Sequence, residues 1–126
     1  MIAILTMTIR REIQFKLFFT RRVADIFNDN IDIHIILSND DVYVATLFTL
    51  KNIEMLMRRD ESSYFWASDM IILPDLSHLT IRKAIQDALD DGYFENACSK
   101  IGTVKTVFDY EGWQSYSEVD KISIYE

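Results

Sequence analysis

Two histidines are the only side chains of this sequence whose ordinary pKa lies near neutral pH, and they fall on different predicted elements. His34 lies in an alternating strand pattern, where a cross-strand contact is its ordinary role. His78 follows Ser77 at the start of a predicted helix, where the helix dipole disfavours a protonated imidazole. A small enzyme that uses His78 or a carboxylate pair is one hypothesis, and it predicts that His78→Ala abolishes turnover while the fold is kept.

Paired carboxylates are the second feature that could take part in chemistry. They occur at Asp40-Asp41, at Asp60-Glu61 and at Asp90-Asp91. General acid–base catalysis can use two carboxyl groups whose environments separate their pKa values. Each pair falls in a predicted turn, loop or helix end, where water keeps both groups ionised. We therefore interpret the pairs as solvated surface charge or as contacts for a basic partner.

The sequence contains none of the common catalytic or metal-binding motifs. HExxH, CxxC and GxSxG are absent, and Gly92, Gly102 and Gly112 are isolated, so no phosphate-binding loop can be drawn. Cys98 is the single cysteine, so it cannot form an internal disulfide, and we expect a small buried side chain near a helix end. We expect no metal, no cofactor and no enzymatic activity.

Charge is distributed unevenly along the chain. Nineteen of the twenty carboxylates follow residue 22, where they meet only eight Lys and Arg, so residues 23–126 carry a formal charge of −11. The first 22 residues carry +4, from five basic side chains against one acid. The sequence pI is about 4.7. Such a protein is expected to attract basic partners and not to bind nucleic acid directly.

Length and composition predict one folded domain over residues 1–126. A chain of this size can bury a single core, and 49% of its residues are hydrophobic, with only one Pro and three Gly. No stretch approaches the ~20 apolar residues of a membrane span. The charges at the start follow the apolar run, which is not the order of a signal peptide. We expect a cytoplasmic protein that does not enter membranes.

The first third of the chain gives the least decided pattern. Residues 11–19 alternate as a strand does, but helical spacing also runs on to residue 27, so both interpretations stay open. Thr20 is a plausible N-cap for a short helix in which Val23, Ile26 and Phe27 form the apolar stripe.

Three clearer elements follow. Alternation over residues 31–37 and 42–48, with turn residues between them, predicts a β-hairpin. Thr49 is a natural N-cap, and the apolar spacing after it predicts a helix over residues 50–58. Residues 64–73 form an apolar and aromatic run closed by Pro74, which predicts a central strand covered on both faces.

That predicted strand places two side chains in the interior. Trp66 is expected to be core. Asp69 interrupts the apolar run, and a buried carboxylate is costly unless it is hydrogen-bonded or paired. A structural hydrogen-bonding role is therefore preferred for Asp69 over a direct functional role.

The clearest amphipathic helix begins after Ser77, a predicted N-cap, and ends at Gly92. Its apolar residues recur at helical spacing, at Ile81, Ala84, Ile85, Ala88 and Leu89. A short helix or turn over residues 93–100 and two strands, over residues 103–108 and 119–125, complete the chain. The predicted fold class is α+β: a single domain with a mainly antiparallel sheet of about five strands, two to three packed helices and a non-hairpin crossover.

Part of this pattern resembles a known family. The segments YVATLFTLKNIEMLM, YFWASDMIIL and LTIRKAIQDALDDGYFE follow one another between residues 43 and 95, about two-fifths of the chain. In this order they are similar to small bacterial immunity proteins, particularly those of contact-dependent growth inhibition, a polymorphic toxin system. The matched positions, such as Phe48, Trp66, Ile85 and Tyr93, are framework and form no catalytic signature.

The resemblance implies a non-enzymatic protein that binds one cognate toxin C-terminal domain in the cytoplasm and keeps it inactive. Such toxins are often nucleases with a basic substrate-binding cleft, and an acidic inhibitor can cover that cleft as nucleic acid does. The contact residues of immunity proteins vary, so the family pattern assigns none here.

Contact residues are therefore predicted from exposed charge near the ends of elements. The candidates are Asp40 and Asp41 on the hairpin, Asp60 and Glu61 before the predicted central strand, and Asp87, Asp90 and Asp91 on the long helix. Asp109, Glu111 and Trp113 form a second candidate patch, with the tryptophan as an apolar anchor.

The basic N-terminal segment supports an alternative hypothesis. Its five basic residues are Arg10, Arg11, Lys16, Arg21 and Arg22, interleaved with Phe side chains. In a nucleic-acid-linked regulatory protein they would contact phosphates or bases, and binding to RNA or DNA would weaken with salt. The other interpretations are intramolecular balance against the acidic body and a contact between subunits of a homodimer.

Overall fold

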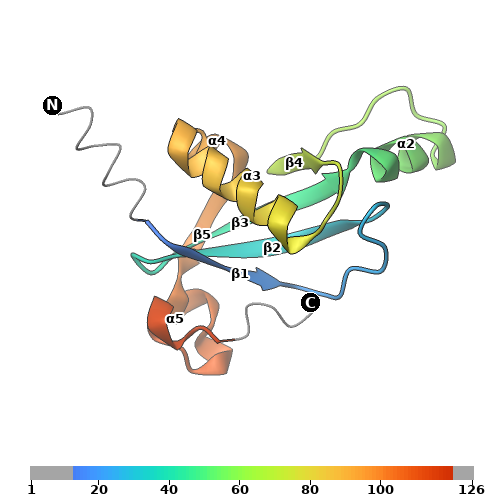
Figure 1. The fold of residues 1–126 in the computed structure, drawn as a ribbon. Helices are drawn as coiled ribbons and strands as arrows, with labels where there is room; N and C mark the ends of the chain where they lie inside the picture. Colours follow the sequence, from blue (N-terminus) through green and yellow to red (C-terminus); the bar gives the residue numbers. More distant parts are fainter. Residues whose placement is uncertain (1–12, 121–126) are drawn as a thin grey trace, which may run out of the picture.

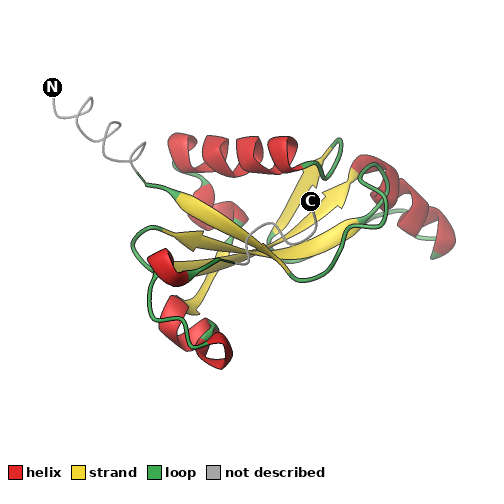
Figure 2. Ribbon diagram, turned by 60° about the horizontal axis from the view of Figure 1, so that its bottom comes forward, coloured by secondary structure: helices red, strands yellow, loops and turns green. Residues whose placement is uncertain are grey.

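In the computed structural model, which describes residues 13–120, five strands form one open sheet with helices on both of its faces (Figures 1 and 2). The strands are β1 (Phe15–Phe19), β2 (Asn30–Leu37), β3 (Asp41–Thr49), β4 (Met70–Leu73) and β5 (Ser99–Thr103). The helices are α2 (Leu50–Arg59), α3 (His78–Asp91), α4 (Phe94–Ala97) and α5 (Val104–Val107), followed by the 3-10 turns η1 (Asp109–Glu111) and η2 (Tyr116–Glu118).

The sheet is built around β3. Strands β1, β2 and β3 form an antiparallel meander, so β2 occupies one edge of β3. The other edge is shared, because β5 pairs antiparallel with residues 41–44 and β4 pairs parallel with residues 46–49. The connection from β3 through α2 to β4 is the predicted non-hairpin crossover. The α+β fold class and the mainly antiparallel sheet of five strands are confirmed.

Helix caps follow the signals in the sequence. The hydroxyl of Thr49 accepts a hydrogen bond from the backbone N–H of Asn52 at the start of α2. Ser77 does the same for Thr80 in α3, and Gly92 ends α3 in the left-handed conformation with φ 79°. Four helices are present among the described residues, but α4 and α5 have only four residues each. None of the helices in this part of the chain is long and apolar enough to cross a membrane.

Two apolar clusters cover the two faces of the sheet. Alternate residues of β2 point to opposite faces, so Ile33 and Ile35 join the first cluster and Ile36 the second. The first cluster lies under α3 and α4, which contribute Ile85 and Phe94. The second contains Val42, Val104, Phe108, Trp113 and Val119, on the side of α5 (Figure 1).

The predicted central strand over residues 64–73 is wrong in its extent and its position. Only Met70–Leu73 forms a strand, and β4 pairs with β3 alone. Tyr64 and Trp66 are 61% and 78% exposed in the loop before it, so neither is core. The strand begins late because Asp69 has a φ of 52°, which is incompatible with extended backbone.

Asp69 takes the hydrogen-bonding role preferred for it, but at a junction between strands. Its backbone carbonyl accepts from the N–H of Thr46 at 2.9 Å, and its Oδ1 accepts from the hydroxyl of Ser99 at 2.6 Å. Asp69 thereby connects the start of β4 to the start of β5, where both strands share the edge of β3.

Three other element predictions differ from the structure. Strand β5 begins at Ser99, inside the predicted helix or turn over residues 93–100, and no strand was predicted there. Thr20 caps no helix: its hydroxyl donates to the carbonyl of Asp32, and residues 20–29 form a loop in which Asp25 and Asp29 accept bonds from nearby backbone N–H groups. Such bonds compete with helix formation. Residues 104–107 form α5 and not a strand, because Thr103 and Thr106 build a capping box. Most of the predicted strand over residues 119–125, like residues 11 and 12 of the first one, lies outside the described residues.

Candidate binding face

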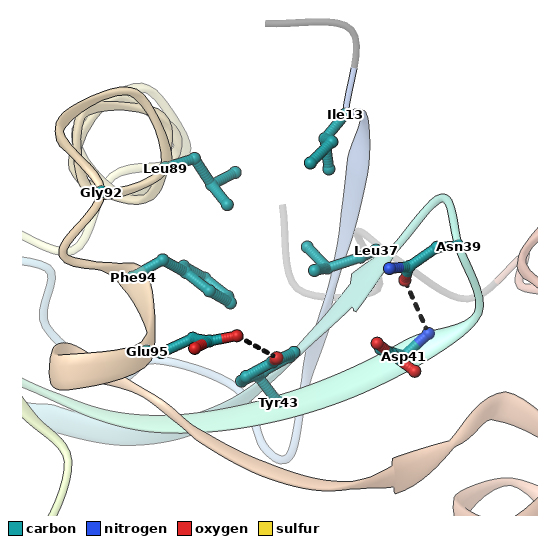
Figure 3. Close-up of a pocket in the computed structure, with 9 residues that line it drawn as sticks. All are labelled: Ile13, Leu37, Asn39, Asp41, Tyr43, Leu89, Gly92, Phe94 and Glu95. Carbon is teal, nitrogen blue, oxygen red and sulfur yellow. Dashed lines mark hydrogen bonds between the residues drawn. The ribbon is translucent and has the colours of Figure 1, made fainter. Parts of the chain in front are cut away.

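A pocket of about 300 Å³ opens where the β2–β3 hairpin faces the end of α3 and the start of α4 (Figure 3). We call it the acidic pocket. It is lined by Ile13, Leu37, Asn39, Asp41, Tyr43, Leu89, Gly92, Phe94 and Glu95. Two of these side chains are carboxylates that come from elements far apart in the sequence. The fold therefore gathers charge from the hairpin and from α4 at one site.

The hydroxyl of Tyr43 lies beside one of the carboxylates of the acidic pocket. It donates a hydrogen bond to Oε1 of Glu95 at 3.1 Å (Figure 3), and its ring packs against Phe94 with 4.7 Å between ring centroids. Burial raises the pKa of the Tyr43 phenol, and so do the hydrogen bond to Glu95 and the negative charges of Glu95 and Asp41. The phenol therefore stays protonated and remains a donor.

The hairpin turn positions the other carboxylate. Oδ1 of Asn39 accepts from the backbone N–H of Asp41 at 3.0 Å, and Asp40 adopts a φ of 77°, which Asp and Asn tolerate in turns. Asp41 forms an ion pair with Lys100 on β5, with 3.2 Å between Oδ1 and Nζ. Oδ1 of Asp40 accepts from the backbone N–H of Tyr116 at 2.7 Å, so this carboxylate stabilises the packing of the C-terminal segment.

The end of α3 lies beside the acidic pocket, because Leu89 and Gly92 line it. Asp90 and Asp91 lie between these two residues in the sequence, and both acids are exposed but do not line the acidic pocket. Oδ1 of Asp90 accepts a hydrogen bond from Gln86 at 3.0 Å. We define the acidic face as Asp41 and Glu95, which line the acidic pocket, together with the exposed Asp90 and Asp91 at the adjoining end of α3.

The remaining predicted acids lie elsewhere. Asp87 is exposed one turn earlier on α3, where it pairs with Lys83 at 3.0 Å. Asp60 and Glu61 follow α2, and Figures 1 and 2 place α2 and α4 at opposite ends of the sheet. Asp60 is paired there with Arg59. These three acids do not join the acidic face.

The second predicted patch is not a surface anchor site. Asp109 and Glu111 belong to η1, next to α5 on the other side of the sheet. Trp113 is only 8% exposed and packs against Phe108 with 5.3 Å between ring centroids. Its burial contradicts the anchor prediction, because the indole packs inside the second apolar cluster.

Sequence reasoning missed Glu95 and Tyr43. Glu95 is an isolated acid in the first turn of α4, and its only local signal is its position shortly after Gly92. Tyr43 reads as an ordinary strand residue. Only the packing of α4 beside β3 places the two side chains together.

Two of the five basic residues near the N-terminus have internal partners. Nζ of Lys16 donates to the carbonyls of Tyr116 and Val119 at 2.9 and 3.0 Å. Arg21 pairs with Asp29 at 2.8 Å. The ion pair of Arg21 agrees with intramolecular balance against the acidic body, whereas Lys16 contacts backbone carbonyls and no carboxylate. Arg22 is exposed, and the predictions for Arg10 and Arg11 lie outside the described residues.

The side chains with nucleophilic or metal-binding chemistry are dispersed. His34 is half-buried beside Phe108, and His78 stacks on Phe19 with 4.8 Å between ring centroids. Cys98 is buried as predicted, and burial with the nearby charge of Asp69 raises the pKa of its thiol to about 12. Within residues 13–120, no three His, Cys, Asp or Glu side chains are grouped so that they could hold a metal ion.

Comparison with known proteins returns no relative. No family model, no curated protein and no solved structure matches the chain. The fold and the acidic pocket together define an α+β protein with two carboxylates at one pocket.

Proposed function

We propose that this chain is an immunity protein of a contact-dependent growth inhibition system. It binds the C-terminal toxin domain of its cognate system in the cytoplasm and neutralises it without catalysis. The toxin is a nuclease with a basic cleft, and the acidic face covers that cleft. The resemblance of residues 43–95 to immunity proteins and the formal charge of −11 over residues 23–126 support this function.

One observation carries the proposal. Acids from the hairpin and from α4 line one pocket beside the end of α3, although Asp41 and Glu95 are 54 positions apart in the sequence. Localised negative charge attracts a basic partner and fixes its orientation. Such a surface can inhibit a nuclease by binding alone, without a catalytic group. An interface of roughly 1,200 to 2,000 Å² in total would cover the cleft.

The test uses the full chain and a candidate toxin C-terminal domain, taken from a large secreted toxin if a neighbouring gene encodes one. We expect a one-to-one complex that weakens as salt is raised, because opposite charges are screened. The double variant Asp90→Lys with Asp91→Lys should weaken binding at least about tenfold, since it replaces attraction by repulsion at the acidic face. Calorimetry or interferometry measures the affinity, and survival of cells that express the toxin measures protection.

A matched variant controls for total charge. Asp60→Lys with Glu61→Lys changes the net charge equally at the opposite end of the sheet, and it should keep the affinity within about twofold. Equal losses in both variants would show that only net charge matters, which contradicts the acidic face. The absence of any complex with the toxin domain would remove the proposed function.

A further inference from the structure

The acidic pocket combines two kinds of surface. Leu37, Leu89 and Phe94 supply apolar walls, and Asp41 and Glu95 supply carboxylates at one end (Figure 3). A ligand that fits both must have an apolar stem and a cationic head. Long basic side chains have this composition, because their methylene groups pack on apolar surface while the charged group stays at a polar end.

The polar end of the acidic pocket is arranged to receive a cation. Glu95 is exposed, and one of its oxygens already accepts from the hydroxyl of Tyr43, so the carboxylate is held in place. The side chain of Asp41 is 24% exposed. Lys100 contacts Asp41 but is not among the residues that line the acidic pocket. The ammonium group of Lys100 therefore lies beside the acidic pocket and does not fill it.

We propose that the acidic pocket binds the side chain of one arginine presented by a partner protein. Its methylene stem packs on Leu37 and Leu89, and its guanidinium group lies between Asp41 and Glu95. Arginine fits better than lysine because its planar fork can bond two acceptor groups at once. The identity of the partner as a toxin rests on the proposed function.

The chemistry can be tested without any partner protein. The probe is N-acetyl-arginine methylamide, titrated into the isotope-labelled full chain, and its citrulline analogue serves as a neutral control of nearly equal shape. We expect saturable shifts in the backbone amide signals of Tyr43, Gly92 and Glu95 with the arginine probe. The citrulline probe should shift them little. Equal shifts from both probes, or none from arginine, would overturn the proposal.

Substitutions then test the two carboxylates. Glu95→Gln and Asp41→Asn keep the shape of each side chain and should each weaken binding of the arginine probe about fivefold, because the guanidinium group then bonds an uncharged amide oxygen instead of a carboxylate. Asp87→Asn removes a carboxylate of α3 outside the acidic pocket and should leave the affinity unchanged. Unchanged binding in both pocket variants would overturn the proposal.

Two further outcomes separate the possible occupants and the two proposals. If the probe binds only after Arg10→Gln and Arg11→Gln, the occupant is the chain's own N-terminal segment, and the assignment to a partner is wrong. If the arginine probe binds but the toxin domain does not, the pocket assignment stands and the immunity function fails. If the toxin domain binds but the probe does not, the pocket assignment fails and the immunity function stands.

Discussion

His34 shows how packing controls the charge of a single residue. Its ring lies between Phe18 and Phe108, with centroids at 5.9 and 5.7 Å, and its Nδ1 has no hydrogen-bond partner. Burial lowers the pKa of the imidazole, and the negative charge of Asp32 offsets part of this effect. The folded protein therefore favours neutral His34 more strongly than the unfolded chain does.

This preference gives a prediction for the pH dependence of stability. The unfolded imidazole has a pKa of about 6.5, and the folded pKa is lower, so the unfolded state binds the proton more readily. The stabilisation is complete above the unfolded pKa and is lost as pH falls through it towards the folded pKa. The unfolding free energy of the parent protein should therefore be lower at about pH 5.5 than at about pH 7.5. In His34→Phe this decrease, measured by urea denaturation at both pH values, should be smaller. An equal loss in both proteins would show that His34 does not contribute.

The two tryptophans show why burial is hard to predict for single residues. Trp66 sits in a dense apolar run, yet its only ring neighbour in the described structure is Tyr64 at 5.0 Å, and it is exposed. Trp113 follows a polar stretch, yet it contacts Phe18, which is 95 positions earlier in the sequence. Local composition predicted the reverse, because burial depends on contacts that only the folded chain creates.

At the scale of elements, the sequence correctly predicted the helices and strands whose start, end and apolar face are set by nearby residues. The hairpin, α2 and α3 carry their own turn residues, caps and apolar spacing, and all three formed as expected. The run before β4 failed because one positive φ, at Asp69, interrupts the strand. The strand prediction after Thr103 was wrong because Thr103 and Thr106 form a capping box, which starts a helix in a segment whose apolar pattern has the length of a strand. Both wrong predictions have a local cause in backbone conformation and side-chain capping. The alternation of apolar and polar residues carries no information on either.

Helix α2 is attached to the sheet by a buried amide. Asn52 is 4% exposed, and its Oδ1 accepts from Asn30 at 2.9 Å while its Nδ2 donates to Asn28 at 3.2 Å. These bonds join α2 to the start of β2 and to the loop before it. The crossover from β3 to β4 therefore depends on polar contacts as well as on apolar packing.

Asn52→Ala should lower the unfolding free energy by about 2 kcal/mol, because two side-chain hydrogen bonds are lost and their partners are left in a partly buried site. Chemical denaturation measures this change. Lys51→Ala is the matched control, since Lys51 is exposed on the same helix and alanine is a good helix former. A loss below about 0.5 kcal/mol for Asn52→Ala would mean that water replaces both partners.

At the scale of the whole molecule, the candidate site depends on topology. The sequence could predict that Asp41, Asp90 and Asp91 are exposed acids near the ends of elements. It could not predict that Asp41 shares a pocket with Glu95, because that requires α4 and β5 to return alongside β3. It also could not separate them from Asp60, which the crossover carries to the opposite end of the sheet. The sequence predicted which acidic residues are exposed, but not which of them lie together in the folded protein.

The same topology brings the two ends of the described chain together through Lys16. Its ammonium group on β1 donates to two carbonyls of the segment 116–119 and lies 4.3 Å from the centre of the Tyr116 ring. These contacts span about 100 positions of sequence and hold the C-terminal segment against the second apolar cluster. Part of the basic N-terminal charge thus has a structural role.

Lys16→Met keeps most of the apolar stem but removes the donors and the charge, so it should release this segment selectively. We expect faster hydrogen exchange across residues 113–120, with little change in α3, because local opening needs only the contacts of that segment to break. Lys105→Met removes an exposed lysine of α5 and should leave exchange unchanged. Uniformly faster exchange in Lys16→Met would show that the segment and the sheet open as one unit. Unchanged exchange would show that the apolar packing of Trp113 and Val119 is sufficient to hold the segment in place. Selective release would instead show that Lys16 holds the segment 116–119 to β1 at the edge of the sheet.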